Sequence, residues 1–365
     1  MHAQAFKVGM RAPDDVSAAA ELLDRNACQA DHVVAVLGKT EGNGAVNDYT
    51  RALATLSFQH LLAKRGSRSL EAIARRVPII WSGGTEGLMS PHATIFTREP
   101  DRGRPTGQKR FAVGTAYTRD LLPEEFGIAV HAQVAAEGVR AAIKDAGIAS
   151  AEDLHFIQIK TGALTTERIA QARSRGRPVV TTDTYKSMAY ARAVAALGIG
   201  VATGEIAAPT VVDDVIGRDF SIASNVASTS SGVELMNCEV IVLGNSAAST
   251  SDLVPRAARQ RLRQVRAGPI GRHARPAPRD VRGRRHQLHP PHPGGRQRRH
   301  RRGDRRHHVL RVSRRRAPGT ARRRSGRGSG SRLISPASRR DHLLLDADAG
   351  GERALVLEGY RRRIL

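Results

Sequence analysis

Two parts of this sequence present the same three reactive side chains in the same order: a Lys after an apolar run, an Arg, and the Ser of a Ser-x-Gly-x-Glu motif. These residues are Lys39, Arg51 and Ser82 in the first part, and Lys160, Arg192 and Ser230 in the second. The Lys-to-Arg spacings are 12 and 32 residues, and the Arg-to-Ser spacings are 31 and 38. An order that persists while loop lengths change is typical of diverged structural repeats.

This combination of side chains suits chemistry at a carbonyl group. A Ser hydroxyl is a weak nucleophile until a base takes its proton, and a Lys can be that base when its amine is neutral. Burial and a nearby cation such as Arg both lower the pKa of a Lys, and the Gly of the motif could leave backbone N–H groups free to hold an oxyanion. The pattern predicts a Ser–Lys dyad, with Glu86 and Glu234 orienting it by hydrogen bonds or serving as acid or base.

Simpler interpretations exist for each signal taken alone. A single Lys at a strand end is usually a solvated charge, and Ser-Gly-Gly is usually a turn, so the recurrence is what favours function. GKT at 38–40 is not a phosphate-binding loop, because Val33 stands where that motif needs a Gly. His92 and His155 are interpreted as hydrogen-bonded structural residues.

Strands alternating with helices must position these groups. Apolar runs predict strands at 32–38, 77–84, 154–160, 179–183 and 238–245. Helical spacing predicts helices at 16–27, 50–65, 132–146, 166–175 and 186–197. Both Lys residues fall at strand ends, and both Ser-x-Gly-x-Glu motifs are expected in turns. The order predicts an α/β protein, divided at a Pro/Gly-rich linker into repeats at 1–104 and 105–250.

The charge distribution changes abruptly near residue 255. Up to residue 254 the chain has 26 Lys and Arg against 27 Asp and Glu, whereas the rest has 33 Arg, no Lys and seven acidic residues. The second composition has almost no aromatic residues and no periodicity, so we expect 251–365 to be disordered. Cys28 and Cys238 are too few for a disulfide framework and lack metal-ligand spacing. With no leader and no membrane-length apolar run, we expect a cytoplasmic protein without metal, cofactor or membrane partner.

Several long motifs resemble those of the ring-opening cyclic amide hydrolases, the family of cyanuric acid hydrolase and barbiturase. They are GKTEGNGAVNDYTR (38–51), WSGGTEGLMSPHATIFT (81–97), LLPEEFG (121–127), DTYKSMAYARAVAALGIG (183–200) and VASTSSGVELMNCEVIVLGNS (226–246). The resemblance covers residues 1 to about 254.

The resemblance implies three α/β repeats around a pseudo-threefold axis, each giving a Lys, an Arg and a Ser to one central site. By motif match, Ser230 would be the nucleophile and Lys160 its base. The residues that would bind the substrate, a six-membered cyclic imide, are Arg51, Arg192, Ser82, Lys39, Gly83 and Ser231. Cyanuric acid would open through an acyl-enzyme to carboxybiuret, which loses CO2 to leave biuret. An intact member is expected to be a homotetramer.

Some motifs depart from the family pattern or divide between its two activities. IKTGALT (159–165) replaces the usual Lys-Cys-Pro or Lys-Thr-Pro turn. VPIIWSGG and NDYTR favour barbiturase, whereas ASTSSGVELMN and SMAYARAVAALGIG favour cyanuric acid hydrolase, which we prefer.

The third Lys-Arg-Ser set that the family requires is not in frame. The genetic code allows a test of a shifted reading frame. When codons permitted for residues 285–295, 304–319 and onward to 327 are read one base out of register, they can encode the family's third Arg motif and third Ser-x-Gly-x-Glu motif. We therefore expect a frameshift near 247–256, accompanied by little or no hydrolase activity and poor solubility. The rival hypotheses are a fusion of two repeats with an Arg-rich nucleic-acid-binding arm, and a non-catalytic repeat protein. Adventitious nucleic-acid binding by the Arg-rich segment is expected in either case.

Overall fold

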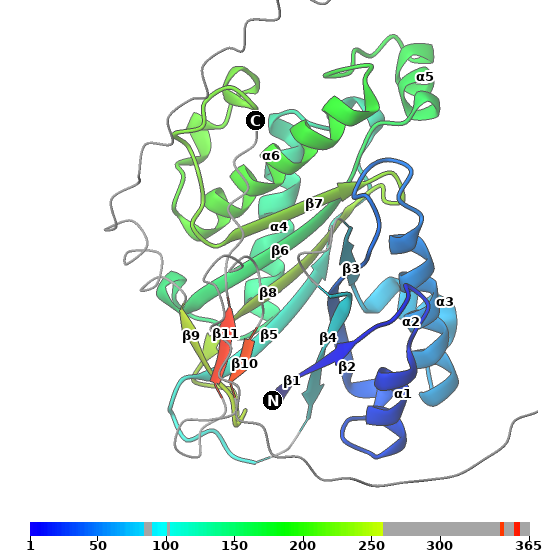
Figure 1. Cartoon of the computed structure of the whole chain (residues 1–365). Coiled ribbons are helices and arrows are strands. Elements are labelled where there is room, and N and C mark those ends of the chain that lie inside the picture. The colour runs from blue at the N-terminus through cyan, green and yellow to red at the C-terminus, as the bar shows by residue number, and fades with distance from the viewer. Residues whose placement is uncertain (84–89, 101–102, 258–343, 347–353, 358–365) are drawn as a thin grey trace, which may run out of the picture. The chain divides into compact units, whose positions relative to one another are not determined.

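The structure is a computed structural model that describes residues 1–83, 90–100, 103–257, 344–346 and 354–357 (Figure 1). All of these residues belong to one compact unit, formed by Met1–Gly268 and Ala337–Leu365. Residues 258–343, which hold most of the Arg-rich segment and the out-of-frame motifs, lie outside the described residues.

The first sheet has four strands in the order β1-β4-β2-β3, namely His2–Gly9, His92–Glu99, Val33–Lys39 and Ile79–Ser82. β2 pairs in parallel with β3 and antiparallel with β4, which also pairs antiparallel with β1. Its helices are α1 (Ser17–Asp24), α2 (Thr50–Arg65) and α3 (Leu70–Arg76). Apolar side chains of these helices pack against one face of the sheet, around Phe58 and Trp81, whose ring centroids are 5.3 Å apart.

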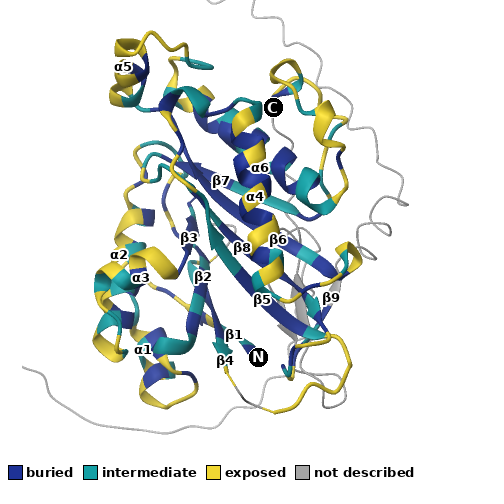
Figure 2. Cartoon of the chain, turned by 180° about the vertical axis from the view of Figure 1, so that it is seen from behind, coloured by how far each residue is buried: buried dark blue, intermediate teal, exposed yellow. Residues whose placement is uncertain are grey.

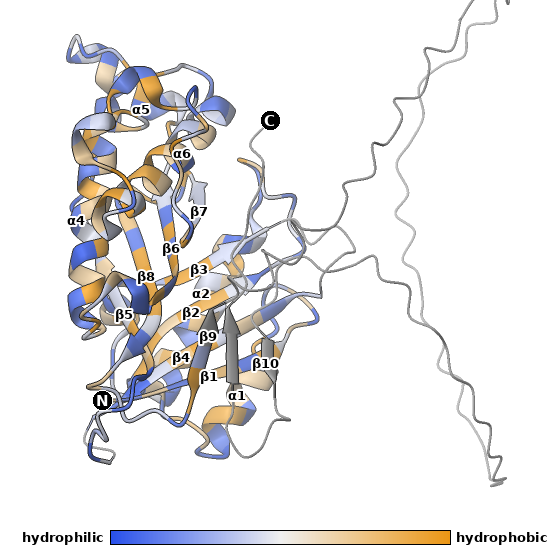
Figure 3. Ribbon diagram, turned by 90° about the vertical axis from the view of Figure 1, so that its left-hand side faces the viewer, coloured by the Kyte–Doolittle hydropathy of each residue, from blue (hydrophilic) through white to orange (hydrophobic). Residues whose placement is uncertain are grey.

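The second sheet repeats this arrangement in the order β5-β8-β6-β7, namely Arg110–Tyr117, Cys238–Ser246, Leu154–Gly162 and Ala227–Gly232. β6 pairs in parallel with β7 and antiparallel with β8, which pairs antiparallel with β5. Its helices are α4 (Ala129–Asp145), α5 (Thr166–Ser174) and α6 (Thr184–Thr203). Figure 3 shows α4 and α6 along one side of this sheet, where α4 contacts β5 and β8 and α6 contacts β6 and β7.

The two sheets agree in register as well as in strand order. Lys39 is opposite Ser82 on β3 and His92 on β4. In the second sheet, Lys160 is opposite Ser230 on β7 and Glu239 on β8. The register of the antiparallel pair also shifts at the same place in both sheets, between Val33 and Ala35 and between Leu154 and Phe156. The α/β fold class and the two recognisable repeats are therefore confirmed.

The two sheets pack face to face through a shared apolar cluster. The first sheet contributes Ala35, Ile80 and Phe96, and the second contributes Phe111, Phe156, Ile241 and Leu243. The rings of Phe96 and Phe111 meet across the interface, with centroids 6.2 Å apart. Figure 2 shows the central strands of both sheets as buried, between helices with exposed outer faces. Each sheet thus has apolar contacts on both faces: its helices cover one face, and the opposite sheet covers the other.

Helix α3 was not predicted from the sequence, and the other main differences lie in the strands. VVTTD (179–183) forms no strand, because it leads into α6, where the Asp183 carboxylate caps the helix by accepting a hydrogen bond from the Lys186 N–H at 3.1 Å. β1, β4, β5 and β7 were not predicted, and β7 contains Ser230, which was expected in a turn. Ser82 likewise ends a strand, while the remainder of its motif, 84–86, lies outside the described residues.

Three short strands fall in the part of the chain where no regular structure was expected. β9 (Val254–Ala257), β10 (Leu344–Asp346) and β11 (Ala354–Leu357) form a sheet in the order β10-β11-β9. β10 and β11 are short apolar runs within a segment otherwise dominated by Arg. Among the helices of the described residues, none has the length and apolar character needed to cross a membrane.

We expect Phe96→Ala to destabilise the chain by about 3–5 kcal/mol, because it opens a cavity at the sheet–sheet interface where Phe96 is fully buried. Phe220, which is 63% exposed, provides the control, and Phe220→Ala is expected to change the free energy of unfolding by less than about 0.5 kcal/mol. Urea denaturation followed by circular dichroism measures both. Equal effects of the two substitutions would contradict this packing.

Candidate active site

The second sheet carries a row of four polar side chains across its strands: Tyr117, Glu239, Lys160 and Ser230. Directly opposed residues on paired strands project to the same face, and residues two apart along a strand share that face. Phe156 on β6 and Ile241 on β8 both belong to the sheet–sheet cluster. The row therefore lies on the face that the second sheet turns toward the first.

Lys160 is held by a carboxylate. Its ammonium Nζ lies 2.5 Å from Oε1 of Glu234, and the two side chains are 3% and 30% exposed. Burial acts to raise the pKa of the Glu234 carboxyl, but the charge and hydrogen bond of Lys160, together with the charge of Arg51, outweigh it and hold that pKa below its usual value. The Glu of the second Ser-x-Gly-x-Glu motif is thus an ion-pair partner of the candidate base.

Arg51 brings a charge from the first repeat to the second. It is buried in the first turn of α2, and its Nη1 donates to the carbonyl oxygen of Ser231 at 3.3 Å. Nη2 donates to the Ala45 carbonyl at 2.9 Å, and Nε lies 3.7 Å from the Asp48 carboxylate. The guanidinium is therefore fixed between its own loop and the residue that follows Ser230.

The Asp48 carboxylate organises the loop before α2. It accepts hydrogen bonds from the backbone N–H of Gly44 at 2.8 Å and of Thr50 at 3.1 Å. Gly83 packs so closely against it that a Cβ atom there would lie 2.0 Å from Asp48 Oδ2. The carbonyl oxygen of Gly83 also accepts a hydrogen bond from Lys39 Nζ at 3.2 Å. Gly83 is thus needed for close approach, and it links the loop to Lys39. Lys39, Ser82 and His92 form a matching row on the first sheet, the first row, and the row on the second sheet is the second row.

The remaining predicted residues lie around these two rows. Ser82 and Lys39 are opposite each other in the first row. The Ser231 hydroxyl donates to the Met188 carbonyl on α6 at 3.0 Å, so it points away from the second row. Arg192 is half-buried on α6, one turn beyond Met188. Glu86 lies outside the described residues.

Both histidines singled out in the sequence make hydrogen bonds, His92 to a nearby residue and His155 to a residue on another strand. Nδ1 of His92 is 2.8 Å from the Ser90 carbonyl, and Nε2 of His155 is 2.7 Å from the Asn245 side-chain nitrogen. His92 nevertheless occupies, in the first row, the position that Glu239 has in the second.

Glu239 is a further candidate site residue, which could not be identified from the sequence. It stands between Lys160 on β6 and Tyr117 on β5. Burial raises the pKa of its carboxyl to about 7, with the charge of Lys160 acting against the rise and that of Glu234 adding to it. The Tyr117 hydroxyl is buried with no described residue within hydrogen-bond distance, and burial raises its pKa as well. Glu239 and Tyr117 are recognised only from the strand register, which cannot be deduced from the sequence.

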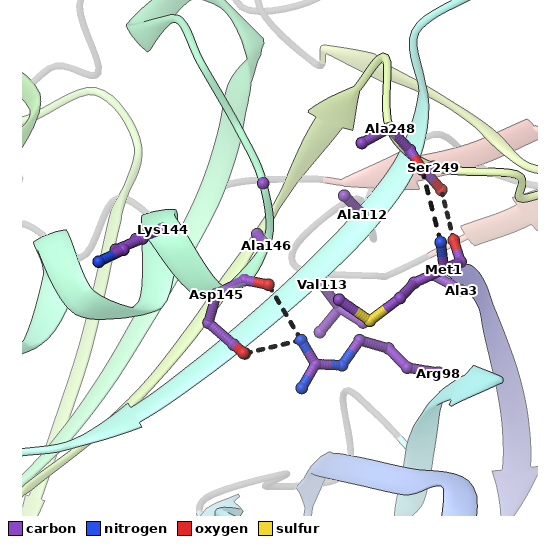
Figure 4. A pocket seen from close by; sticks show the side chains of 11 residues that line it. Met1, Ala3, Arg98, Ala112, Val113, Lys144, Asp145, Ala146, Ala248 and Ser249 are labelled. Carbon is purple, nitrogen blue, oxygen red and sulfur yellow. Dashed lines mark hydrogen bonds and ion pairs between the residues drawn. The ribbon is translucent and has the colours of Figure 1, made fainter. Parts of the chain in front are cut away.

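A cavity of about 130 Å³ lies toward the other end of the strands, away from the second row. It is lined by residues of both repeats, including Arg98 and Asp145 (Figure 4). Arg98 Nη1 donates to the Asp145 carboxylate at 2.8 Å and to its carbonyl oxygen at 3.0 Å. These contacts join the repeats, and the cavity contains none of the candidate Lys and Ser residues.

Comparison with known proteins places the two repeats in one family. The sequence profile of the family described as "Amidohydrolase ring-opening protein (Amido_AtzD_TrzD)" matches residues 4–265. The chain belongs to this family. The match spans both four-stranded sheets and both Lys–Ser rows.

Named relatives and solved structures agree with this assignment. The chain is 48% identical over 257 residues to a cyanuric acid amidohydrolase from Enterobacter cloacae, covering 70% of each protein. It is 46% identical over 241 residues to barbiturase 2 of Nocardioides sp., covering 66% of this chain and 64% of that protein. A solved structure titled "Cyanuric acid hydrolase: evolutionary innovation by structural concatenation" superposes with a TM-score of 0.66 at 45% identity, over 69% of each chain.

The raised pKa of Glu239 predicts a stability that depends on pH. A carboxyl whose pKa rises from the ordinary 4.5 to about 7 on folding stabilises the fold fully below about pH 4.5. That contribution is lost as the pH rises through 7, and it amounts to at most about 3 kcal/mol. The Gln of the Glu239→Gln variant does not titrate, so the variant does not lose this contribution. The free energy of unfolding of the variant minus that of the wild type should therefore increase by about 2–3 kcal/mol from pH 5 to pH 8.

The control for this experiment is Glu21→Gln on the exposed face of α1. Its difference from the wild type in urea denaturation should be nearly the same at both pH values. A Glu239→Gln difference that is equally independent of pH would contradict a raised pKa of the Glu239 carboxyl.

Proposed function

We propose that this chain carries the machinery of a ring-opening cyclic amide hydrolase, with Ser230 as the nucleophile and Lys160 as its base. One observation carries this proposal: Ser230 and Lys160 are buried and directly opposite each other, with Glu234 on the Lys and Arg51 bound beside the Ser. A hydroxyl, an amine, a carboxylate and a guanidinium from the two repeats thus lie together. These are the groups that acyl transfer requires.

In the first step the Ser230 hydroxyl attacks a ring carbonyl carbon. The proton of Oγ passes to Lys160, which acts as the base in its deprotonated form, and the new bond joins Oγ to the carbonyl carbon. Glu234 stabilises the ammonium that forms, as the carboxylate of a Ser-His-Asp triad stabilises its imidazolium. Arg51 lies where it can attract the developing oxyanion, because it already contacts the carbonyl of Ser231.

In the second step the ring opens. The bond between the carbonyl carbon and the ring nitrogen breaks, and the Lys160 ammonium returns its proton to that nitrogen. Water then attacks the Ser230 ester, again losing a proton to Lys160, and the acid is released as Oγ regains a proton. The residues that we propose to bind the ring are Arg51, Arg192, Ser82, Lys39, Gly83 and Ser231. Since the Ser231 hydroxyl is bonded to Met188, Ser231 would contribute its backbone N–H.

Cyanuric acid is the substrate that we propose first, with barbiturate as the alternative. The relatives carry both names at similar identity, 48% for cyanuric acid amidohydrolase and 46% for barbiturase. The motif around the nucleophile, ASTSSGVELMN (227–237), resembles that of the cyanuric acid enzymes. Ring opening of cyanuric acid would give carboxybiuret, which decarboxylates to biuret.

We further propose that turnover by this 365-residue chain is impaired. The family match ends at residue 265, and the alignment with the Enterobacter cloacae enzyme leaves the rest of both proteins unmatched. The two sheets, β1–β4 and β5–β8, support repeats at 1–104 and 105–250, and the end of the match supports a third segment, 251–365, read out of frame. A site built by three repeats would then lack one Lys, one Arg and one Ser.

A chimera tests both halves of this proposal. Residues 1–254 are joined to the part of the Enterobacter cloacae enzyme that this chain does not match. We expect the chimera to hydrolyse cyanuric acid, and the unaltered chain to be at least about 100-fold slower, since it lacks groups that bind and polarise the ring. Loss of substrate absorbance and biuret formation measure the reaction, with barbiturate assayed in parallel. Equal turnover by the unaltered chain would contradict impairment.

Substitutions in the chimera identify the nucleophile. Ser230→Ala should lower kcat by about 10⁴-fold or more, because the covalent step is lost. Ser82→Ala should instead raise KM by about 10-fold, the loss of one hydrogen bond to the ring. Mass spectrometry of quenched reactions should find the acyl group on the peptide that contains Ser230. The assignment fails if Ser230→Ala retains turnover while Ser82→Ala abolishes it.

A further inference from the structure

The two Lys–Ser rows differ in the residue two positions before the Lys. In the second sheet this residue is Gln158, and in the first it is Leu37. Gln158 shares the face of Lys160 and is opposite Ser228 on β7. It is 4% exposed, which is deep burial for an amide. A buried amide on this face needs hydrogen-bond partners, and the first row has no counterpart to it.

The Gln158 side chain makes three hydrogen bonds that together use its donors and its acceptor. Nε2 donates to the Ile159 carbonyl at 2.9 Å and to Ser230 Oγ at 3.4 Å. Oε1 accepts from the Ser228 hydroxyl at 2.7 Å. The nucleophile proposed above is therefore in contact with an amide that is itself held from two sides.

The Ile159 carbonyl decides which end of the amide faces Ser230. A carbonyl oxygen only accepts hydrogen bonds, so the amide must turn its NH2 group toward it. The same NH2 group then faces Ser230 Oγ. Oγ accepts from Gln158, which leaves its own hydrogen free to point elsewhere, and Lys160 is the neighbouring base.

We propose that Gln158 is a positioning residue for Ser230. Gln158 donates a hydrogen bond to Ser230 Oγ and thereby makes Ser230 more reactive than Ser82. This rests on Ser230 being the nucleophile. As the proton of Oγ moves to Lys160, negative charge grows on Oγ and the N–H···O bond strengthens. The same bond stabilises Oγ when it leaves in hydrolysis of the ester. Because the Leu37 side chain has no N–H donor, Ser82 receives no such side-chain hydrogen bond from the equivalent position.

The reactivity of Ser230 toward methanesulfonyl fluoride tests this role in the full chain, without turnover. Ser230 Oγ attacks the sulfur, fluoride leaves, and the proton of Oγ passes to Lys160. We expect Gln158→Met, which keeps the length of the side chain, and Gln158→Leu, the first-row residue, to slow labelling of Ser230 by about 10-fold to 100-fold. The half-saturating reagent concentration should not change. Peptide mass spectrometry locates the label and measures its rate.

A double variant separates positioning from stability. Gln158→Met leaves the Ser228 hydroxyl without its acceptor, and Ser228→Ala removes that hydroxyl. If Gln158 only satisfies Ser228, the double variant should regain the wild-type labelling rate, and this would overturn the proposal. If Gln158 acts on Oγ, the double variant should regain thermal stability but stay slow. Ser228→Ala alone should change the rate less than about 3-fold, since the Ile159 carbonyl still orients the amide.

Two other outcomes would also refute the role of Gln158. A wild-type labelling rate in Gln158→Met would show that the amide does not assist Oγ. An unaltered chain that labels at Ser82 and not at Ser230 would refute the nucleophile assignment, and the positioning role with it. The site of the label therefore tests the proposed function, and the rate tests the further inference.

Discussion

The pairing of β6 with its two neighbours fixes where every polar group of the second row lies. Lys160 is opposite Ser230 on one side and Glu239 on the other because β6 runs parallel to β7 and antiparallel to β8. A slip of one residue would turn Lys160 toward the helices and bring Ile159 to its place. Phe156 and Ile241, on the same face, oppose such a slip because they pack against the first sheet. The apolar contacts between the sheets therefore also hold the chemistry in place.

Electrostatics joins the two repeats at this row. Arg51 belongs to the first repeat and contacts the second. The charge and hydrogen bond of Lys160, with a smaller contribution from the charge of Arg51, overcome burial and lower the pKa of the Glu234 carboxyl. A buried charge that loses its partner is costly, so each member of this group depends on the others. The position of Arg51 depends in turn on Asp48 of the first repeat, because the Asp48 carboxylate shapes the loop from which Arg51 extends. The second row is thus a property of both repeats.

Much of the fold could be predicted from the sequence, and the reasons are local. The helix predicted at 50–65 is α2, and the apolar run at 154–160 lies within β6. β7 could not be predicted because its residues, Ala-Ser-Thr-Ser-Ser-Gly, show no apolar alternation, and its backbone is fixed by pairing with β6. VVTTD (179–183) has the composition of a strand, yet tertiary context makes it the approach to a helix.

The candidate site was predictable only where a motif repeats. Lys160 and Ser230 were found because Lys39 and Ser82 share their order and surroundings. Glu239 and Gln158 have no such duplicate: their counterparts are His92 and Leu37, with different chemistry. Their relation to Ser230 arises from strand register, which depends on tertiary packing and cannot be deduced from spacing alone.

The shared shift of register has a historical consequence. It falls six to four residues before the Lys in both β2 and β6, a place that serves neither row directly. Two sheets that carry the same irregularity at the same position have inherited it, so the shift predates the duplication that produced them.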